Sequence, residues 1–445
     1  MSSSENTPDR DNIEVRSMRI AMFTNTYVPH VGGVARSING LAAGLDAYGH
    51  QVLIVAPEFD GAAENETHII RVPAIQHFEG SDYSFPIPAS RHLTKVLREF
   101  KPNIIHSHHP FLLGDTALRI AAALNVPVVF TYHTRYDHYS HYMVGNSPRI
   151  QRFALDLALG YTELCDSVVA PSNSVAVFLR SQGIKIPVHT IPSGISVETY
   201  SHGDRQRGRA LANIPQDAFV VGHVGRLAPE KNLDFLVNCL ADFCHKNPQA
   251  HCLIVGNGPV KSTVEAAFKT GSLSERLHFL GKLDPRALAD AYHAMDVFAF
   301  SSLSETQGLV IAEAMASGVP VVALDASGVR DIVNNGVNGC LLPLQRRDEF
   351  VTALQWVANL DTAAKQQLND AARVTAQSYS QDAFAKNMLE LYRQLMHTKL
   401  PAKIYSTDNR WHIAGRSLAK EWKILRNISH AITDAIFYPA PEYDQ

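Results

Sequence analysis

The sequence contains few residues that could cross-link the chain. Its 445 residues include five cysteines, at Cys165, Cys239, Cys244, Cys252 and Cys340, and none of them forms a C-x-x-C pair. An odd number of cysteines without such pairs argues against a disulfide framework and against a cysteine-based zinc site. A reducing cytoplasm is therefore the expected compartment.

Long hydrophobic runs and a strong net charge are also missing. No window of about 18 uncharged apolar residues occurs, so no transmembrane helix is expected. Residues 1–17 are polar and charged, which predicts a disordered tail and not a signal peptide. The net charge is only −3, so the composition does not point to a nucleic-acid partner.

The usual sequence patterns of a metal site are absent as well. Metal-bridged phosphate chemistry usually relies on an Asp pair at a strand end, but Asp9 and Asp11, the one Asp-x-Asp pair, lie in the tail. His106, His108 and His109 have no cysteine or carboxylate nearby to complete a zinc site. The sequence therefore predicts a site that uses no metal ion.

What the sequence does contain is an alternation of short apolar runs and longer amphipathic stretches. The runs form two sets, at residues 19–24, 51–56, 103–106, 126–132 and 166–170, and at residues 219–225, 251–256, 277–280, 297–300 and 319–323. Runs rich in Val and Ile predict buried parallel strands, with helices between them. The expected fold is α/β, with two Rossmann-like, doubly wound parallel-sheet domains.

The two sets of strands are separated by residues 189–217, whose Pro and Gly content suits a domain boundary. We predict one domain over residues 18–195, a second over 196–380 and C-terminal helices over 381–445. Residues 410–437 repeat apolar side chains at helical spacing, which predicts an amphipathic helix. Its apolar face holds Trp411, Leu418, Trp422, Leu425, Ile432 and Ile436, and its polar face holds Arg416, Lys420, Lys423 and Arg426.

The most informative motif is SETQGLVIAEAMASGVP, residues 304–320. A helix that starts near Gly308 would offer unpaired backbone N–H groups, and its dipole would favour a bound diphosphate. Glu305 precedes this helix and can hold sugar hydroxyls, while Glu313 lies within it and can accept two hydroxyl hydrogen bonds from a ribose. In isolation, the segment also fits a surface loop with a capping carboxylate.

A second motif, VGRLAPEKN, places Arg226 after a strand and Lys231 at the start of a helix. Ligands bind at that edge of a parallel sheet. Two cations there can neutralise the charge that develops on a leaving diphosphate. An isolated Arg and Lys of this kind are more often solvated surface cations.

Two loops of the first domain carry further candidates. Gly32 and Gly33 let backbone amides approach a phosphate or sugar, although a tight strand-to-helix turn explains them equally well. They do not form the G-x-G-x-x-G motif of dinucleotide sites. His133 ends a buried strand, where it can hydrogen-bond a transferred sugar. Tyr136, Tyr139 and Tyr142 follow it and form either an acceptor wall or half-buried core contacts.

Taken together and in this order, these motifs resemble the retaining glycosyltransferases of family 4, which have the GT-B fold. The resemblance covers roughly residues 19–396. It implies that the first domain binds the acceptor and the second binds a nucleotide sugar, and that the final helices first cross back to the first domain. No cofactor and no metal are implied. The sequence gives no indication of the oligomeric state.

The resemblance also implies a role for each matching residue. Gly32 and Gly33 would contact the phosphate and the acceptor side, and His133 would lie beside the transferred sugar. The remaining donor contacts would come from Arg226 and Lys231 on the diphosphate, Glu305 on the sugar 3- and 4-hydroxyls, the backbone amides of Gln307, Gly308, Leu309 and Val310, and Glu313 on the ribose.

Within the family, FTYHTRYDHYSHY and SETQGL resemble diacylglycerol glucosyltransferases, peripheral membrane enzymes that use UDP-glucose. A membrane-facing helix would carry Arg91, Lys95, Arg98 and Lys101. We therefore predict glucosyl transfer to a lipid at an anionic surface, on the inner face of the cell membrane. Two alternatives stay open: transfer to a soluble sugar, small polar molecule or polysaccharide, and a non-catalytic scaffold that binds a sugar nucleotide.

Overall fold

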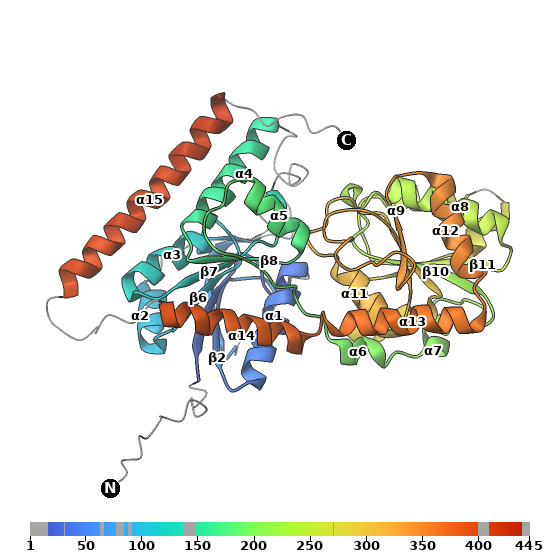
Figure 1. Ribbon diagram of the computed structural model, residues 1–445, viewed down its shortest axis with the longest axis horizontal. Helices are drawn as coiled ribbons and strands as arrows, with labels where there is room; N and C mark the ends of the chain where they lie inside the picture. Colours follow the sequence, from blue (N-terminus) through green and yellow to red (C-terminus); the bar gives the residue numbers. More distant parts are fainter. Residues whose placement is uncertain are drawn as a thin grey trace, which may run out of the picture.

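The structure is a computed structural model that describes residues 17–30, 32–62, 66–76, 84–87, 91–136, 147–269, 271–398 and 409–437. It consists of an N-terminal lobe and a C-terminal lobe, each a sheet flanked by helices, with a long final helix on the outside of the N-terminal lobe (Figure 1).

The N-terminal lobe is built on a parallel sheet with the strand order β3-β2-β1-β6-β7-β8-β9. Its strands are β1 (Arg19–Phe23), β2 (Gln51–Pro57), β3 (Ile69–Val72), β6 (Ile104–Ser107), β7 (Val128–Thr131), β8 (Ser167–Ala170) and β9 (Val188–Thr190), beside a small antiparallel pair of β4 (Ala74–Ile75) and β5 (Phe85–Pro86). Its helices are α1 (Gly33–Ala47), α2 (Arg91–Phe100), α3 (Leu113–Leu124), α4 (Pro148–Glu163) and α5 (Asn173–Ser181).

The C-terminal lobe repeats the plan with the strand order β12-β11-β10-β13-β14-β15, again parallel. Its strands are β10 (Phe219–Val224), β11 (Ala250–Val255), β12 (Leu277–Gly281), β13 (Val297–Phe300), β14 (Val321–Leu324) and β15 (Gly339–Leu342). Its helices are α6 (Val197–Ser201), α7 (Arg205–Leu211), α8 (Leu233–Lys246), α9 (Lys261–Ala267), α10 (Pro285–Ala294), α11 (Leu309–Ala316), α12 (Arg347–Ala358) and α13 (Thr362–Gln377), with 3₁₀ turns η3 (Pro229–Lys231) and η4 (Gly271–Arg276).

Strand β1 shows why the apolar runs do not alternate with polar residues. Ala21 and Phe23 pack into the core on one face of the sheet, whereas Ile20 and Met22 pack into the core on the other face. Because helices cover both faces, every residue in the middle of the strand must be apolar. The predicted fold class of two doubly wound parallel sheets is confirmed.

Helix α14 (Gln381–Thr398) carries the chain back from the C-terminal lobe to the N-terminal lobe, where it lies along α1 (Figure 1). Its Phe384, Met388 and Tyr392 join the core that contains Ile38 and Leu41 of α1. The two chain segments that connect the lobes are hydrogen-bonded to each other. The Ile195 N–H donates to the Tyr379 carbonyl over 2.8 Å, and the Gln381 N–H donates to the Ile195 carbonyl over 3.0 Å.

Helix α15 (Asn409–Phe437) packs on α3 and α4 of the N-terminal lobe. It runs antiparallel to α4, because Lys420 donates to the Leu164 carbonyl near the end of α4 and Asn427 donates to the Leu157 carbonyl further back. Among the described residues, no helix is long and apolar enough to cross a membrane.

Candidate active site

The start of α11 has the geometry that the sequence predicts for an anion site. Gly308 is the residue before the helix, and its φ of 74° is a left-handed conformation that glycine adopts without steric cost. Within the described residues, the backbone N–H groups of Leu309 and Val310 donate to no other protein group. These amides, together with the helix dipole, form a positive end that favours a phosphate.

Lys231 and Glu305 lie side by side next to this helix start. Lys231 ends the 3₁₀ turn after β10, Glu305 lies in the loop after β13, and the Lys231 Nζ to Glu305 Oε1 distance is 2.5 Å. Burial alone would raise the pKa of Glu305, but the Lys231 ammonium outweighs it and holds that pKa below its usual value. Burial would likewise lower the pKa of Lys231, and Glu305 instead raises it. Both groups are therefore charged at neutral pH.

Glu313 points from α11 to the other lobe. Its Oε1 accepts a hydrogen bond of 3.0 Å from Arg36 of α1, and its Oε2 accepts one of 2.8 Å from the Tyr292 hydroxyl. The Tyr200 hydroxyl lies near this carboxyl group and lowers its pKa. Burial raises the pKa of Glu313, and Arg36 offsets the effect only in part. The carboxyl group thus lies where α1 and α11 face each other across the two lobes.

The Gly-Gly loop lies at the start of α1, on the same side as Arg36. Gly32 is the residue before the helix, and Gly33 is its first residue. A Cβ atom built on Gly33 meets no atom of the described residues within 4 Å. Glycine is therefore not required here by contacts within the protein, and the space beside Gly33 is open to a ligand.

His133 follows β7 and is held by both lobes. Its ring Nε2 lies 3.0 Å from the Nδ1 of His108, and its carbonyl accepts a hydrogen bond of 3.1 Å from the Thr306 hydroxyl of the C-terminal lobe. Burial lowers the pKa of His133 well below its usual value, and the neighbouring His109 and His106 lower it further. The His133 ring is therefore neutral and can exchange hydrogen bonds with sugar hydroxyls.

The other predicted residues differ in their settings. Arg226 is exposed, two residues after β10, at the same sheet edge as Lys231. The Gln307 side chain makes two hydrogen bonds to the backbone of Ser193, so it joins the start of α11 to the segment that connects the lobes. Tyr136 is only 4% exposed and packs edge-on against Phe111 and Tyr132.

The proposed acceptor wall is thus only partly described. Tyr136 has its ring in the core of the N-terminal lobe, which leaves little of it for contact with an acceptor. Tyr139 and Tyr142 lie outside the described residues. The acceptor-binding role of all three stays a prediction. No group of three or more His, Cys, Asp or Glu side chains in the described part of the chain could hold a metal ion.

Comparison with known proteins identifies both lobes as parts of a glycosyltransferase. The model of Glycosyltransferase Family 4 matches residues 31–199, and that of Glycosyl transferases group 1 matches residues 204–375. A GDP-mannose-dependent alpha-mannosyltransferase of Corynebacterium glutamicum is 30% identical over 399 residues, which cover 86% of this chain and 90% of the relative. The chain belongs to glycosyltransferase family 4. It is therefore a hexosyltransferase, as predicted.

Other family members and solved structures agree with this assignment. An alpha-monoglucosyldiacylglycerol synthase of Acholeplasma laidlawii is 28% identical over 402 residues, covering 85% of this glycosyltransferase and 98% of the relative. A sucrose-phosphate synthase of Thermosynechococcus elongatus superposes with a TM-score of 0.67 at 25% identity, covering 86% of this chain and all of the other. The GT-B fold is confirmed.

Sequence reasoning missed several residues of the site. Arg36, Tyr200 and Tyr292 surround Glu313, and His108 contacts His133. Arg36 follows the Gly-Gly loop closely enough to have been noticed, and His108 lies in a histidine cluster that we considered only for zinc. Tyr200 and Tyr292 carry no local signal, because only the folded C-terminal lobe brings them to α11.

Proposed function

We propose that this glycosyltransferase moves glucose from UDP-glucose to a diacylglycerol-type lipid, with retention of anomeric configuration. The observation that carries the proposal is the start of α11, where the amides of Leu309 and Val310 have no partner among the described residues and where Glu305, paired with Lys231, and Glu313 lie close by in the chain. That arrangement matches the three parts of a nucleotide sugar: an anionic diphosphate, a sugar with several hydroxyls and a ribose.

In this proposal, Lys231 and the amides at the start of α11 bind the diphosphate and stabilise its charge as it leaves. Glu305 accepts hydrogen bonds from the sugar hydroxyls while Lys231 keeps it ionised. Glu313 accepts those of the ribose. Arg226 is a second cation for the diphosphate, and His133 faces the transferred sugar from the other lobe.

Retention is best explained by transfer on a single face of the sugar. Glu305 is held by Lys231, and Glu313 is held by Arg36 and Tyr292, so neither carboxylate is placed as a free nucleophile. The acceptor hydroxyl would attack the anomeric carbon from the side of the leaving diphosphate. The C–O bond to the diphosphate breaks, the new C–O bond forms, and the leaving phosphate oxygen takes the proton. The protein supplies position and charge stabilisation.

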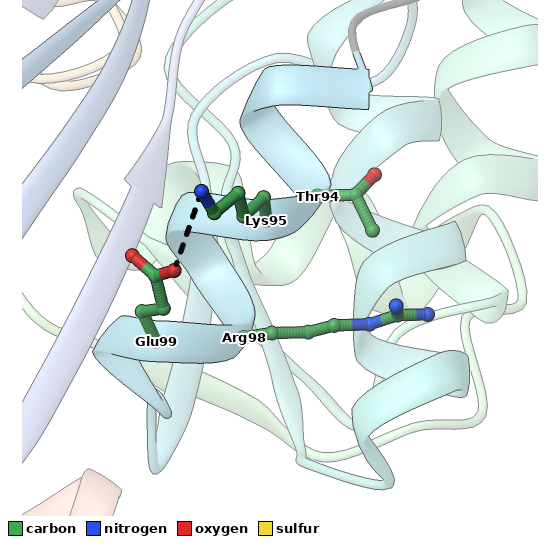
Figure 2. A pocket seen from close by; sticks show the side chains of 4 residues that line it. All are labelled: Thr94, Lys95, Arg98 and Glu99. Carbon is green, nitrogen blue, oxygen red and sulfur yellow. Dashed lines mark ion pairs between the residues drawn. The ribbon is translucent and has the colours of Figure 1, made fainter.

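The lipid acceptor is supported by the relatives and by surface charge. Two of the similar proteins are alpha-monoglucosyldiacylglycerol synthases, from Streptococcus pneumoniae and Acholeplasma laidlawii. On α2, Figure 2 shows Lys95 turned toward Glu99, with which it pairs at 4.0 Å, while Arg98 extends away from both. Arg98 on this helix and Lys101, the residue after it, are therefore the cations with which we expect a membrane to interact. We place the enzyme on the inner face of the cell membrane.

Mannosyl transfer is the second candidate, because several relatives of equal similarity are GDP-mannose-dependent mannosyltransferases. A panel of donors decides between the two. The purified enzyme is incubated with dioleoylglycerol in mixed micelles and with UDP-glucose, GDP-mannose or ADP-glucose, and the glycolipid product is identified by mass spectrometry. We expect a glucosyl lipid from UDP-glucose alone. A mannosyl lipid would overturn the donor, and transfer only to soluble sugars would overturn the acceptor.

A further inference from the structure

The outward face of α15 exposes a row of large apolar side chains. Its members are Leu418 (72% exposed), Trp422 (68%), Leu425 (52%), Ile432 (46%) and Ile436 (55%), here called the α15 stripe. The other exposed large apolar side chains of the described residues are scattered over the fold. Single exposed apolar residues are normal on a protein surface, whereas a continuous row of them marks an interaction site.

The stripe is not the face by which α15 holds on to its own lobe. Ile424, Ala431 and Ala435 are buried against α3 and α4. Positions four and seven residues apart on a helix share a face, so the stripe and the buried residues form two separate rows along the helix. The buried row already anchors α15, and no other described part of the chain covers the stripe. It extends over about 27 Å of helix.

Cations border the stripe. Lys423 and Arg426 are exposed and lie beside it, whereas Glu421, the acid at its other border, is held by Arg119 through two hydrogen bonds. The surface next to the stripe is therefore positive. Such charge attracts anionic lipid headgroups, and it repels a second copy that would bring the same cations face to face.

The direction of α15 relates the stripe to the proposed acceptor route. The helix runs antiparallel to α4, so its last turns lie toward the first turns of α4. Asp434 is close enough to Asp156 of α4 to raise its pKa, after the larger effect of burial. Helix α4 begins downstream of His133 and Tyr136 along the chain. The last turns of α15 thus lie beside the helix that the chain enters after His133 and Tyr136.

We propose that the α15 stripe lies on the surface of an anionic phospholipid bilayer, with its apolar side chains among the acyl chains and with Lys423 and Arg426 at the headgroups. A helix with large apolar residues, including tryptophan, on one side and cations beside them binds in this way. This inference rests on the lipid acceptor proposed above. It adds the element that holds the enzyme at the membrane and the orientation of that element.

The test compares two double variants and one single control variant by flotation of the full-length enzyme with vesicles of phosphatidylglycerol and phosphatidylcholine. Leu418→Gln/Trp422→Gln removes apolar side chains from the stripe. Val374→Gln is the matched control, because Val374 is also 72% exposed but lies on α13 of the C-terminal lobe. We expect binding to fall at least about tenfold in the stripe variant and to be unchanged in the control. Lys423→Gln/Arg426→Gln should weaken binding to anionic vesicles and leave the weaker binding to neutral vesicles unchanged.

Each outcome has a defined meaning. Unchanged flotation of the stripe variant overturns the inference. A wild-type dimer in sedimentation velocity that the stripe variant converts to monomers also overturns it, because the occupant is then a second copy. A larger fall in melting temperature for the stripe variant than for Val374→Gln would show that another part of the chain covers the stripe. That result would also overturn the inference.

Turnover separates this inference from the proposed function. With a short-chain diacylglycerol in solution, the stripe variant should keep wild-type turnover, because the substituted residues lie on the outside of the N-terminal lobe and α11 lies in the C-terminal lobe (Figure 1). If flotation of the wild type depends on the stripe but the enzyme glycosylates no lipid, the proposed acceptor is wrong and the docking surface is supported. If the wild type glycosylates the lipid and the stripe variant still floats, the docking surface fails alone.

Discussion

At the scale of single residues, the donor site depends on charges that are stable only as a pair. Lys231 and Glu305 have side chains that are 23% and 15% exposed, so each would be costly to bury alone. Each shifts the pKa of the other toward the charged form. A charged carboxylate is thereby kept ready for sugar hydroxyls beside a cation for the diphosphate.

We predict that Lys231→Ala abolishes measurable turnover and lowers the free energy of unfolding by about 3 kcal/mol, because it leaves a buried charge without its partner. In the wild type, the lowered pKa of Glu305 makes its contribution to stability present above the pKa of an unfolded Glu, and lost as the pH falls through the folded-state pKa. In the variant, burial without Lys231 raises that pKa above its unfolded value. Its stability should then fall as the pH rises.

The measurement is the melting temperature of Lys231→Ala at pH 5.5 and pH 8. Lys231→Ala/Glu305→Gln is the control, since it has no carboxyl group to titrate at this position. We expect the single variant to lose more stability than the double variant between the two pH values. Equal losses would show that Glu305 is not the group that responds.

At the scale of elements, the donor site is the start of one short helix. Helix α11 begins at Leu309, and Gly308 before it has a φ of 74°. The same glycine that starts the helix also leaves its first amides uncovered.

Gly308→Ala should destabilise the C-terminal lobe by about 1–2 kcal/mol, because L-residues are strained at positive φ. It should also weaken UDP binding, since the new Cβ lies at the start of α11 and 3.1 Å from the Cδ1 of Ile311. Gly336→Ala is the control, with a φ of 76° and no atom within 4 Å of its Cβ. Isothermal titration with UDP should show a loss for Gly308→Ala only. A similar loss in both variants would contradict a local role for Gly308.

The sequence predicts elements best where burial fixes their composition. All ten apolar runs that we identified correspond to strands. Nine of them are central strands, both faces of which must be apolar, and the tenth is the edge strand β12. Among the strands of the two parallel sheets, β3, β9 and β15 escaped prediction. They are short edge strands, and β9 consists of Val188, His189 and Thr190. An edge strand has one neighbouring strand instead of two, so polar residues are tolerated in it.

Site residues could be predicted only where one segment carries the signal. The Glu305–Glu313 segment and Lys231 were found because a helix start and a strand end have local patterns. Arg36 and Glu313 are 277 positions apart, and no local pattern reports a contact of that kind. Helix α15 was predicted from its apolar row, but which row faces the lobe depends on α3 and α4 and could not be read from periodicity.

At the scale of the whole molecule, polar contacts hold the two lobes together around the site. Arg36 bonds Glu313, and Ser174 of α5 bonds Asp331 through its hydroxyl over 2.8 Å. Such contacts are weak enough to break and re-form during turnover, which the entry of a donor and the release of a product require.

Arg36→Ala/Asp331→Ala should shift the ligand-free enzyme toward more open arrangements. We expect a larger radius of gyration in small-angle X-ray scattering than in the wild type, and a several-fold higher KM for the donor, because closure then costs more. Saturating UDP should reduce the difference. Arg36→Lys/Asp331→Asn serves as the milder control. An unchanged radius of gyration in the alanine variant would show that these contacts do not set the lobe arrangement.

The paired connection between the lobes limits how they can move. Residues 193–195 and 379–381 run beside each other and are hydrogen-bonded, and a Cβ on Gly194 would lie 2.6 Å from the Cα of Gln381. Two bonded strands of chain resist twisting far more than one does. We therefore expect the lobes to rotate about one axis through this paired connection and to resist other relative motions. Each closure would then bring the N-terminal lobe back to the same position over the donor.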